Sequence, residues 1–460
     1  MSHAPIHPTA LQDFKASLHG EVIGPHDEGY ESARRLRNAM IDRRPALIVR
    51  CVDVSDVISA VQFARGHDLA VAVRAGGHDV SGHGVCDDGL VIDLSLMKGM
   101  QVNPEKRIAR AETGLTSGEF LRATEPFGLV IPTGVFSTVG LSGLTLGGGI
   151  GWLSSRYGLT IDNLLAIEMV TADGTLLSAS ASEHPDLFWA VRGGGGNFGV
   201  VTALTFQLQP LAQVLRGGVI HPLAHAREVL RFYREYTRQC PDELTVNASL
   251  TTGPDGHPVI ILDACYCGDD LAEGERVLAP LRTFGPPLVD LIRPMSVLES
   301  TMLLDSFSPP GRCHAYHAEA LPYLSDEALD TALAFGSARP SPFSNVVFYQ
   351  IHGAAMRVDP AATAFALRHD HYILEMIAQW VEGQAQPYIE WVQRFEGAIK
   401  PFAEEGVYVN FLTDEGEARV RASYGANYER LVQIKNRYDP KNFFHVNQNI
   451  KPMTSQEQDL

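Results

Sequence analysis

The chain has 460 residues, 45% of them apolar and 20% charged, and carries a formal net charge of −17 at pH 7. This length predicts two or three domains with ample material for cores. The negative charge argues against nucleic acid or an anionic membrane as a partner, because both would repel the protein. The composition is that of a soluble globular protein.

The cysteine content and the absence of recognisable targeting signals both favour a cytoplasmic location. The sequence contains no apolar run of the roughly 20 residues that cross a bilayer, and its start lacks the basic and apolar regions of a secretory signal. Its sparse cysteines favour a reducing cytoplasm over a disulfide framework. Cys265 and Cys267 would share one face of a strand, and no second pair stands at zinc spacing. We expect them in the core and expect no metal site.

The first predicted elements lie between residues 45 and 75. Short apolar runs at 45–50 and 69–74 predict strands, and the stretch between them predicts a helix that Asp53 or Ser55 can cap. Residues 130–210 are rich in glycine and close with a strand.

The sequence pattern changes after Pro210. Alternating runs predict strands of an antiparallel sheet, with a helix before them and another near the end of the chain. The predicted strands cover 257–266, 312–321 and 345–355, and the helices cover 226–239 and 427–440.

One glycine cluster, Gly194 to Gly199, satisfies the dinucleotide-binding pattern G-x-G-x-x-G. That fingerprint needs a helix after it, because the helix N-terminus holds the pyrophosphate. Here the next residues, VVTALTFQL, alternate and are rich in β-branched types, which predicts a strand. The pattern is therefore not a Rossmann motif. Three glycine clusters in one half of the chain still favour a nucleotide site of another kind, because bare backbone amides bind phosphate well.

Four longer motifs carry a resemblance to a known family. They are RAGGHDVSG, PTGVFSTVGLSGLTLGGGIGWLSSRYGLTIDNLL, DLFWAVRGGGGNFGVVT and NYERLVQIKNRYDPKNFFHVNQNI. They resemble berberine bridge enzyme-like FAD-linked oxidases of the vanillyl-alcohol oxidase (PCMH-type) superfamily. The resemblance implies an α+β fold: a PCMH-type FAD-binding domain of two α+β subdomains (1–210), a substrate domain with a large antiparallel sheet (211–405), and a C-terminal segment (406–460) that returns to the FAD-binding domain.

The resemblance also implies how FAD is held. In the family, the histidine of R-x-G-G-H is joined covalently to the 8α-methyl group of the flavin, which here designates His78. Many relatives form a second bond through a cysteine; its position here is Phe136, so a single attachment is expected. The motifs designate as cofactor-binding residues Arg74, Ala75, Gly76, Gly77, His78, Asp79, Gly82, Thr138, Val139, Gly143, Gly148, Gly149, Gly151, Trp152, Gly199, Val201, Tyr408, Asn410, Asn447 and Asn449.

The implied activity is that of an oxidase acting on an alcohol, sugar or amine group of a small molecule, such as a secondary metabolite. Flavin accepts a hydride while a protein base takes a proton, and dioxygen then reoxidises the flavin to give hydrogen peroxide. Val139 occupies the family position where a small residue accompanies oxygen access. Two alternatives stay open: a dehydrogenase or reductase of the same fold with another electron partner, and a non-catalytic flavin-binding protein.

Two residues are candidates for the base. Tyr408 and Asn410 resemble the Y-x-N segment of the family's active-site strand, and a buried phenol with a lowered pKa could act. His352 lies on the predicted strand 345–355, where alternation places it on the face of Gln350. Either could be structural instead: Tyr408 as an aromatic wall and His352 as a lone strand histidine.

Two further histidines, His314 and His317, lie in the predicted strand 312–321. They would point to opposite faces of the sheet. At most one of them can therefore reach a site.

Overall fold

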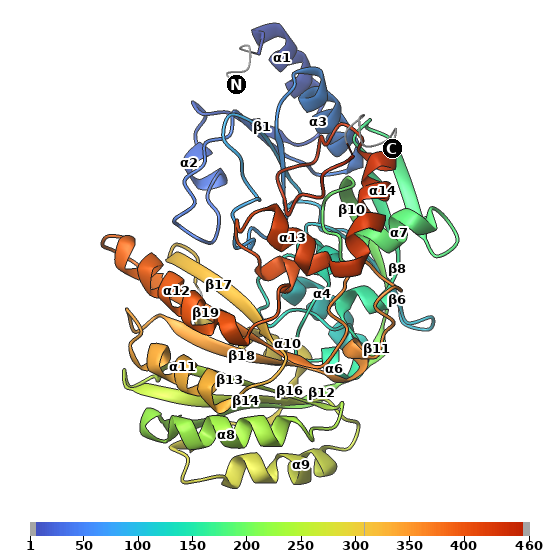
Figure 1. Ribbon diagram of the computed structural model, residues 1–460. Helices are drawn as coiled ribbons and strands as arrows, with labels where there is room; N and C mark the ends of the chain where they lie inside the picture. Colours follow the sequence, from blue (N-terminus) through green and yellow to red (C-terminus); the bar gives the residue numbers. More distant parts are fainter. Residues whose placement is uncertain (1–5, 308, 454–460) are drawn as a thin grey trace.

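The computed structural model describes residues 6–307 and 309–453; the outer ends of the predicted segments 1–210 and 406–460 fall outside these ranges. Within them, three large β-sheets follow one another along the chain, with helices around them (Figure 1). The first two sheets come from the residues before Pro210, and the third comes from the residues after it. No helix among the described residues has the length and apolar character needed to cross a membrane.

The first sheet has the strand order β1-β2-β4-β3, in which β2, β4 and β3 are parallel. The predicted helix becomes α3, whose N-cap is Asp53, and it connects β2 to β3. The elements of this region are α1 (Pro8–Ala16), β1 (Glu21–Ile23), α2 (Tyr30–Ala33), β2 (Leu47–Arg50), α3 (Val54–Gly66), β3 (Val71–Arg74) and β4 (Leu90–Asp93).

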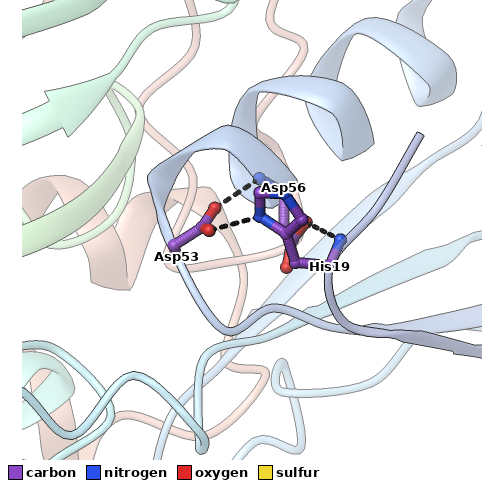
Figure 2. Close-up of side chains that lie close together, drawn as sticks. All are labelled: His19, Asp53 and Asp56. Carbon is purple, nitrogen blue, oxygen red and sulfur yellow. Dashed lines mark hydrogen bonds and ion pairs between the residues drawn. The ribbon is translucent and has the colours of Figure 1, made fainter.

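A polar cluster fixes the start of α3 to the chain before β1 (Figure 2). The imidazole of His19 lies 2.6 Å from the carboxylate of Asp53. The buried carboxylate of Asp56 accepts hydrogen bonds from the backbone N–H groups of His19, Gly20 and Val52. Both carboxylates are thus engaged in capping backbone donors, which is a structural task.

The second sheet is antiparallel, with the order β5-β6-β10-β8-β9. Strand β10 follows the glycine cluster directly, which confirms that Gly194 to Gly199 do not open a Rossmann helix. The elements are β5 (Met100–Asn103), β6 (Ile108–Glu112), α4 (Ser117–Thr124), β7 (Leu129–Val130), α5 (Leu141–Gly147), α6 (Ser154–Tyr157), β8 (Leu164–Val170), β9 (Leu176–Ser180), α7 (Pro185–Val191), β10 (Val200–Gln207) and β11 (Gln209–Pro210).

The third sheet has eight strands in the order β15-β12-β14-β13-β18-β19-β17, with β16 paired to β12. Helices α8, α9, α11 and α12 pack on one face of it around a core of their own (Figure 1). The elements are β12 (Gln213–Pro222), α8 (Ala226–Thr237), β13 (Leu244–Thr252), β14 (Pro258–Tyr266), α9 (Leu271–Thr283), β15 (Val289–Asp290), β16 (Arg293–Ser296), α10 (Val297–Met302), β17 (Cys313–Leu321), α11 (Asp326–Ser337), β18 (Asn345–Ile351), β19 (His371–Trp380) and α12 (Gln386–Ile399).

After α12 the chain returns to the first half of the molecule. Helices α13 (Glu417–Tyr424) and α14 (Tyr428–Tyr438) bury their apolar residues in the core that also holds Trp189 and Phe198. Figure 1 shows α14, in red, beside α7. The end of the chain is therefore part of the same core as the glycine-rich region.

A buried ion pair fastens this return. The ammonium of Lys435 donates to the carboxylate of Asp439 at 2.7 Å and to the carbonyls of Asn197 and Phe444 at 2.7 and 2.9 Å. The side chains of Lys435 and Asp439 are both fully buried. Lys435 therefore ties the glycine cluster around Asn197 to the C-terminal segment.

We expect Lys435→Met to lower the free energy of unfolding by about 3–5 kcal/mol, because it leaves the Asp439 carboxylate buried without its cation. Urea unfolding monitored by far-UV circular dichroism measures this change. Lys441→Met, at an exposed position nearby, is the matched control and should shift stability little. Equal unfolding midpoints for the two variants would contradict this role.

Candidate functional site

A cavity of about 460 Å³ lies between the glycine-rich loops and the open face of the third sheet. One wall comes from the turns and loops of the first half of the chain, and the opposite wall comes from strands of the third sheet. The C-terminal segment closes a third side. The lining comes from residues 74–80, 134–152, 195–201, 247–263, 345–349, 375–379, 408–411 and 444–448, with others between them.

The R-x-G-G-H motif starts at the carboxyl end of a parallel strand. Arg74, the last residue of β3, pairs with Asp93 at the end of neighbouring β4, at 2.6 Å and with both side chains buried. The arginine of the motif therefore anchors the turn to the sheet. The turn then projects its backbone into the cavity.

The glycines of this turn allow it to touch a second loop. A Cβ on Gly76 would lie 2.3 Å from the backbone nitrogen of Gly140, and a Cβ on Gly140 would lie 2.5 Å from that of Gly76. Gly77 has a φ of 66°, in the left-handed region that favours glycine. No other residue fits at this crossing without moving the backbone.

Most of the predicted cofactor-binding residues lie on the cavity wall. Those that line it are Arg74, Ala75, Gly76, Gly77, His78, Asp79, Val139, Gly143, Trp152, Gly199, Val201, Tyr408, Asn410 and Asn447. The others are not among the lining residues, namely Gly82, Thr138, Gly148, Gly149, Gly151 and Asn449.

Packing explains why several of these residues lie behind the wall. A Cβ on Gly151 would lie 1.7 Å from the carbonyl oxygen of Thr133, and one on Gly149 would lie 1.9 Å from the hydroxyl of Thr160. Gly82 turns under the side chain of Ile41. These glycines pack behind the wall and shape the loops, and their assignment to cofactor contact stays a prediction.

His78 lines the cavity, as do two other basic residues, Arg37 and His314. Burial, and then the charge of Arg37, lower the pKa of the His78 imidazole to about 3. The imidazole is therefore neutral at physiological pH, which is the state in which its ring nitrogen is a nucleophile. Phe136 also lines the cavity, whereas none of the six cysteines is among the lining residues.

Tyr408 lines the cavity as expected, and its backbone conformation and the pKa of its phenol both differ from the expectation. The segment 407–412 is not a strand: residues Val409–Phe411 form a 3₁₀ turn. Burial raises the pKa of Tyr408 to about 12, although its oxygen accepts hydrogen bonds from the backbone N–H of Gly149 and from Asn410. The phenol therefore stays protonated at neutral pH, which disfavours it as a base.

His352 lies outside the cavity. Alternation along β18 holds, but the face that carries Gln350 turns toward α8, where Gln350 donates to the carbonyl of Thr237. His352 bonds to the carbonyl of Leu244 and is not among the cavity-lining residues. The opposite face, with Val347 and Tyr349, lines the cavity.

The two histidines of β17 divide as predicted. His314 lines the cavity. His317 lies on the other face, buried 3.0 Å from Glu319, whose second oxygen is bonded by Arg419. That cluster joins the third sheet to α13 and takes no part in the cavity.

The group that sequence reasoning missed is Glu375, in the middle of β19. It lines the cavity and is 5% exposed. Burial raises its pKa to about 7, opposed by hydrogen bonds from Tyr316, at 2.5 Å, and Tyr349. A buried carboxylate that titrates near neutral pH in a cavity has the properties of a general base.

Phe411 connects this carboxylate to the C-terminal turn. Its ring lies 6.2 Å from that of Tyr316, 5.9 Å from that of Tyr349 and 4.9 Å from that of Tyr408, measured between ring centres. The two tyrosines that bond Glu375 are therefore packed against the turn that carries Tyr408. A signal for Glu375 was present in the sequence: it is the one charged residue in the largely apolar run YILEMIAQW.

The wall fits a large polar cofactor. Five lining residues each hold a buried side-chain nitrogen or oxygen that has no hydrogen-bond partner among the described residues: Arg74 Nη1, His83 Nδ1, Trp152 Nε1, His314 Nε2 and Asn447 Oδ1. Unpaired buried polar atoms are costly, so a ligand that supplies partners is expected here. The glycine turns add exposed main chain, which suits pyrophosphate.

Comparison with known proteins agrees with this geometry. Residues 45–180 match the family model described as FAD binding domain, and residues 407–451 match the one described as berberine and berberine like. The FAD-linked oxidoreductase YgaK of Bacillus subtilis is 34% identical, over 95% of this chain and 98% of its own. The (R)-6-hydroxynicotine oxidase of Paenarthrobacter nicotinovorans is 30% identical, over 95% and 97%.

Solved structures give the same result. The 6-hydroxy-D-nicotine oxidase of Arthrobacter nicotinovorans superposes with a TM-score of 0.87 at 29% identity, covering 95% of this chain and 99% of that one. The berberine bridge enzyme-like protein 1 of Physcomitrella patens gives 0.86 at 23% identity, covering 96% and 99%. These likenesses confirm the predicted PCMH-type α+β fold with its large antiparallel sheet.

The raised pKa of Glu375 predicts a pH-dependent stability. Because its folded-state pKa of about 7 lies above the ordinary value of 4.5, the stability that comes with its protonated form is complete below pH 4.5 and is lost as the pH rises through 7. Glu375→Gln resembles the protonated acid. We expect it to stabilise the protein by up to about 3 kcal/mol at pH 8 and by much less at pH 5.

Thermal unfolding at the two pH values measures this difference. Glu382→Gln, an exposed position just after β19, should not alter the pH dependence. If Glu375→Gln gave the same gain at both pH values, the carboxyl would not titrate near neutrality.

Proposed function

Because the chain belongs to the berberine-like family of FAD-linked oxidoreductases, we propose that it is an oxidase that carries FAD on His78. It oxidises an alcohol, sugar or amine group of a small molecule and passes the electrons to dioxygen. The observation that carries this proposal is the buried carboxyl of Glu375, with a pKa of about 7, in the same cavity as His78 and the glycine turns.

The residues that would hold FAD are those of the glycine turns. The backbone around Gly76, Gly77 and Gly140 suits the pyrophosphate, and His78 would form the covalent bond. Asn447 supplies a buried carbonyl oxygen that lacks a protein partner. Bound there, the flavin supplies the hydride acceptor of the reaction.

Glu375 is the proposed base. As a carboxylate it takes the proton of a substrate O–H or N–H group. Tyr316 and Tyr349 each donate a hydrogen bond to it, so they orient the carboxyl and keep it from turning out of the cavity. A bound substrate would cover the carboxyl and exclude water, and the burial of the carboxyl keeps its pKa near 7.

Side chains beyond Glu375 support a hydrophilic substrate. Asn247, Ser249 and Thr251 of β13 line the cavity on the side of the sheet away from β17, with Asn345 of β18 beside them. Hydroxyl and amide groups can both donate and accept, as recognition of alcohols, sugars or amines requires. A tailoring step on a secondary metabolite is one setting for such a reaction.

Two further features support the use of dioxygen and the location. Val139 lines the cavity, and a residue of this size leaves room for oxygen. The six cysteines are all free, which supports the proposed cytoplasmic location.

Glu375→Gln tests the proposed base. Once a screen for peroxide release has identified a substrate, anaerobic flavin reduction should be about 10² to 10⁴ times slower in this variant. In the unaltered protein the rate should rise with pH through about 7, because only the deprotonated carboxyl accepts a proton. Stopped-flow spectroscopy measures both.

Two variants serve as comparisons for this measurement. His352→Gln, outside the cavity, should reduce its flavin at the normal rate. Tyr408→Phe should lose far less than Glu375→Gln. The opposite order, with a hundredfold loss in Tyr408→Phe and a normal rate in Glu375→Gln, would make Tyr408 the base.

The single covalent attachment gives a separate prediction. The flavin should stay on the polypeptide after acid precipitation, and mass spectrometry should find it on the peptide that contains His78. His78→Ala should leave FAD dissociable, whereas Cys86→Ser should keep the attachment. A flavin bound through a thioether would show that the assignment of Phe136 to the usual cysteine position is wrong.

A further inference from the structure

The third sheet carries a second group of polar side chains on its cavity face, away from the proposed base. Asn247 and Ser249 lie on β13, and Asp263 lies opposite Asn247 on neighbouring β14. All three residues line the cavity. They are called the distal polar group below.

The side-chain amide of Asn247 has a fixed orientation. The ladder between β13 and β18 ends at the pair Ala248 and Phe348, and beyond it the Asn247 oxygen accepts the backbone N–H of Gln350 at 3.2 Å. Because an N–H group can bond only to that oxygen, the NH2 group must point the other way. No residue in the described part of the chain bonds to this NH2 group, so Asn247 offers a donor to the cavity.

Asp263 is an acceptor whose charge is already balanced. The guanidinium of Arg216 bonds both of its oxygens, one of them at 2.8 Å. Arg216 is fully buried and lies over the ring of Trp152, 3.7 Å from the ring centre. The side chain of Asp263 is 14% exposed, and each carboxylate oxygen has a second acceptor site. Asp263 can therefore accept a hydrogen bond from a ligand while Arg216 neutralises its charge.

This arrangement favours a neutral group that both donates and accepts. Residues opposite each other on neighbouring strands have Cβ atoms about 5 Å apart, so one ligand group can contact Asn247 and Asp263 together. A cation would meet the NH2 donors of Asn247 and gain little from a carboxylate that Arg216 already neutralises. An anion would be repelled by Asp263. A hydroxyl group satisfies both residues, and the hydroxyl of Ser249 can serve either as donor or as acceptor.

The register of the sheet gives the distance from this group to the base. Val347 of β18 lies opposite Ser249 of β13 on one side and opposite Glu375 of β19 on the other. Two strand spacings separate Ser249 from Glu375, which is about 10 Å. A single six-membered sugar ring is too short to reach across this distance. The apolar side chain of Val347 fills the interval.

We propose that the distal polar group is a second substrate subsite: it binds hydroxyl groups on the far ring of a neutral, polyhydroxylated two-ring molecule, of the size of a disaccharide, whose near ring is oxidised beside Glu375. This inference rests on the proposed function, which places the reaction at Glu375. Asn247, Ser249 and Asp263 determine specificity and take no part in moving the proton or the hydride.

Three defined probes test the subsite by binding alone. Isothermal titration calorimetry is performed on the Glu375→Gln holoenzyme, in which turnover is slow. Cellobiose carries hydroxyl groups on both rings, cyclohexyl β-D-glucoside carries them on one ring, and D-glucose has a single ring. Cellobiose should bind about tenfold more tightly than either of the others, because its second ring adds hydrogen bonds at the distal polar group. Equal affinities for cellobiose and the cyclohexyl glucoside, or no binding of cellobiose, would overturn the proposal.

Ser249→Ala, made in the same background, locates the second ring. It should weaken the binding of cellobiose about three- to tenfold, the effect of one lost hydrogen bond, and leave that of the cyclohexyl glucoside unchanged. Ser178→Ala, at an exposed position of β9, is the matched control and should bind both probes normally. An equal loss for both probes would assign Ser249 a packing role and count against the subsite.

A charged probe tests the neutrality of the subsite. The β-1,4-linked dimer of D-glucosamine, in buffer acidic enough to protonate its amines, should bind no more tightly than cellobiose. A tenfold gain for this cation would show that Asp263 acts as an uncompensated anion, which overturns the assignment to hydroxyl groups.

The outcomes also separate this inference from the proposed function. Cellobiose that binds as expected to a protein that oxidises no small molecule would leave the subsite standing and overturn the oxidase. An oxidase that turns over another small molecule and does not bind cellobiose would overturn the subsite alone.

Discussion

The site depends on one contact in which two backbones meet without side chains between them. Gly76 and Gly140 lie so close that a Cβ on either would overlap the nitrogen of the other. This crossing brings the turn after β3 against the loop before α5, so both present main chain to the cavity. Arg74 and Asp93 hold the turn from below, at the ends of two parallel strands. A nucleotide cradle follows from backbone proximity and needs few side chains.

The opposite wall, formed by the third sheet, is built from side chains. A sheet offers a rigid platform from which alternate side chains point into the cavity, and its other face is covered by helices. Glu375 stands near the middle of this platform between Tyr316 and Tyr349. The desolvation that makes its carboxyl basic also makes the carboxylate costly to bury. The cost is limited because both tyrosines donate to it.

The C-terminal segment makes these two walls a single site. Lys435 fixes it to the glycine cluster, and Phe411 packs against the tyrosines of the sheet. Tyr408, between these points, bonds to the backbone of Gly149. A displacement of this segment would therefore change both the cofactor wall and the surroundings of Glu375. The family match at residues 407–451 covers this connecting element.

Local patterns in the sequence determined much of the cofactor half. The periodicity of residues 45–75, the strand after Gly199 and the R-x-G-G-H turn are set by neighbours a few residues apart, so they could be predicted. The alternation of β18 was predictable in the same way, but which of its faces meets the cavity was not. That choice depends on α8, which covers Gln350 and leaves Tyr349 facing inward.

The protonation chemistry of the cavity side chains was decided only by the tertiary structure. A pKa depends on the surroundings that distant segments create. Burial raises the pKa of Glu375 against the hydrogen bonds from Tyr316 and Tyr349, and burial also raises the pKa of Tyr408, where a lowered value was expected. The lowered pKa of His78 likewise depends on burial and on the charge of Arg37, 41 residues away in the chain. Sequence determined where the backbone turns and which side chains are available; desolvation and charge, which only the folded chain creates, decided which of them can act.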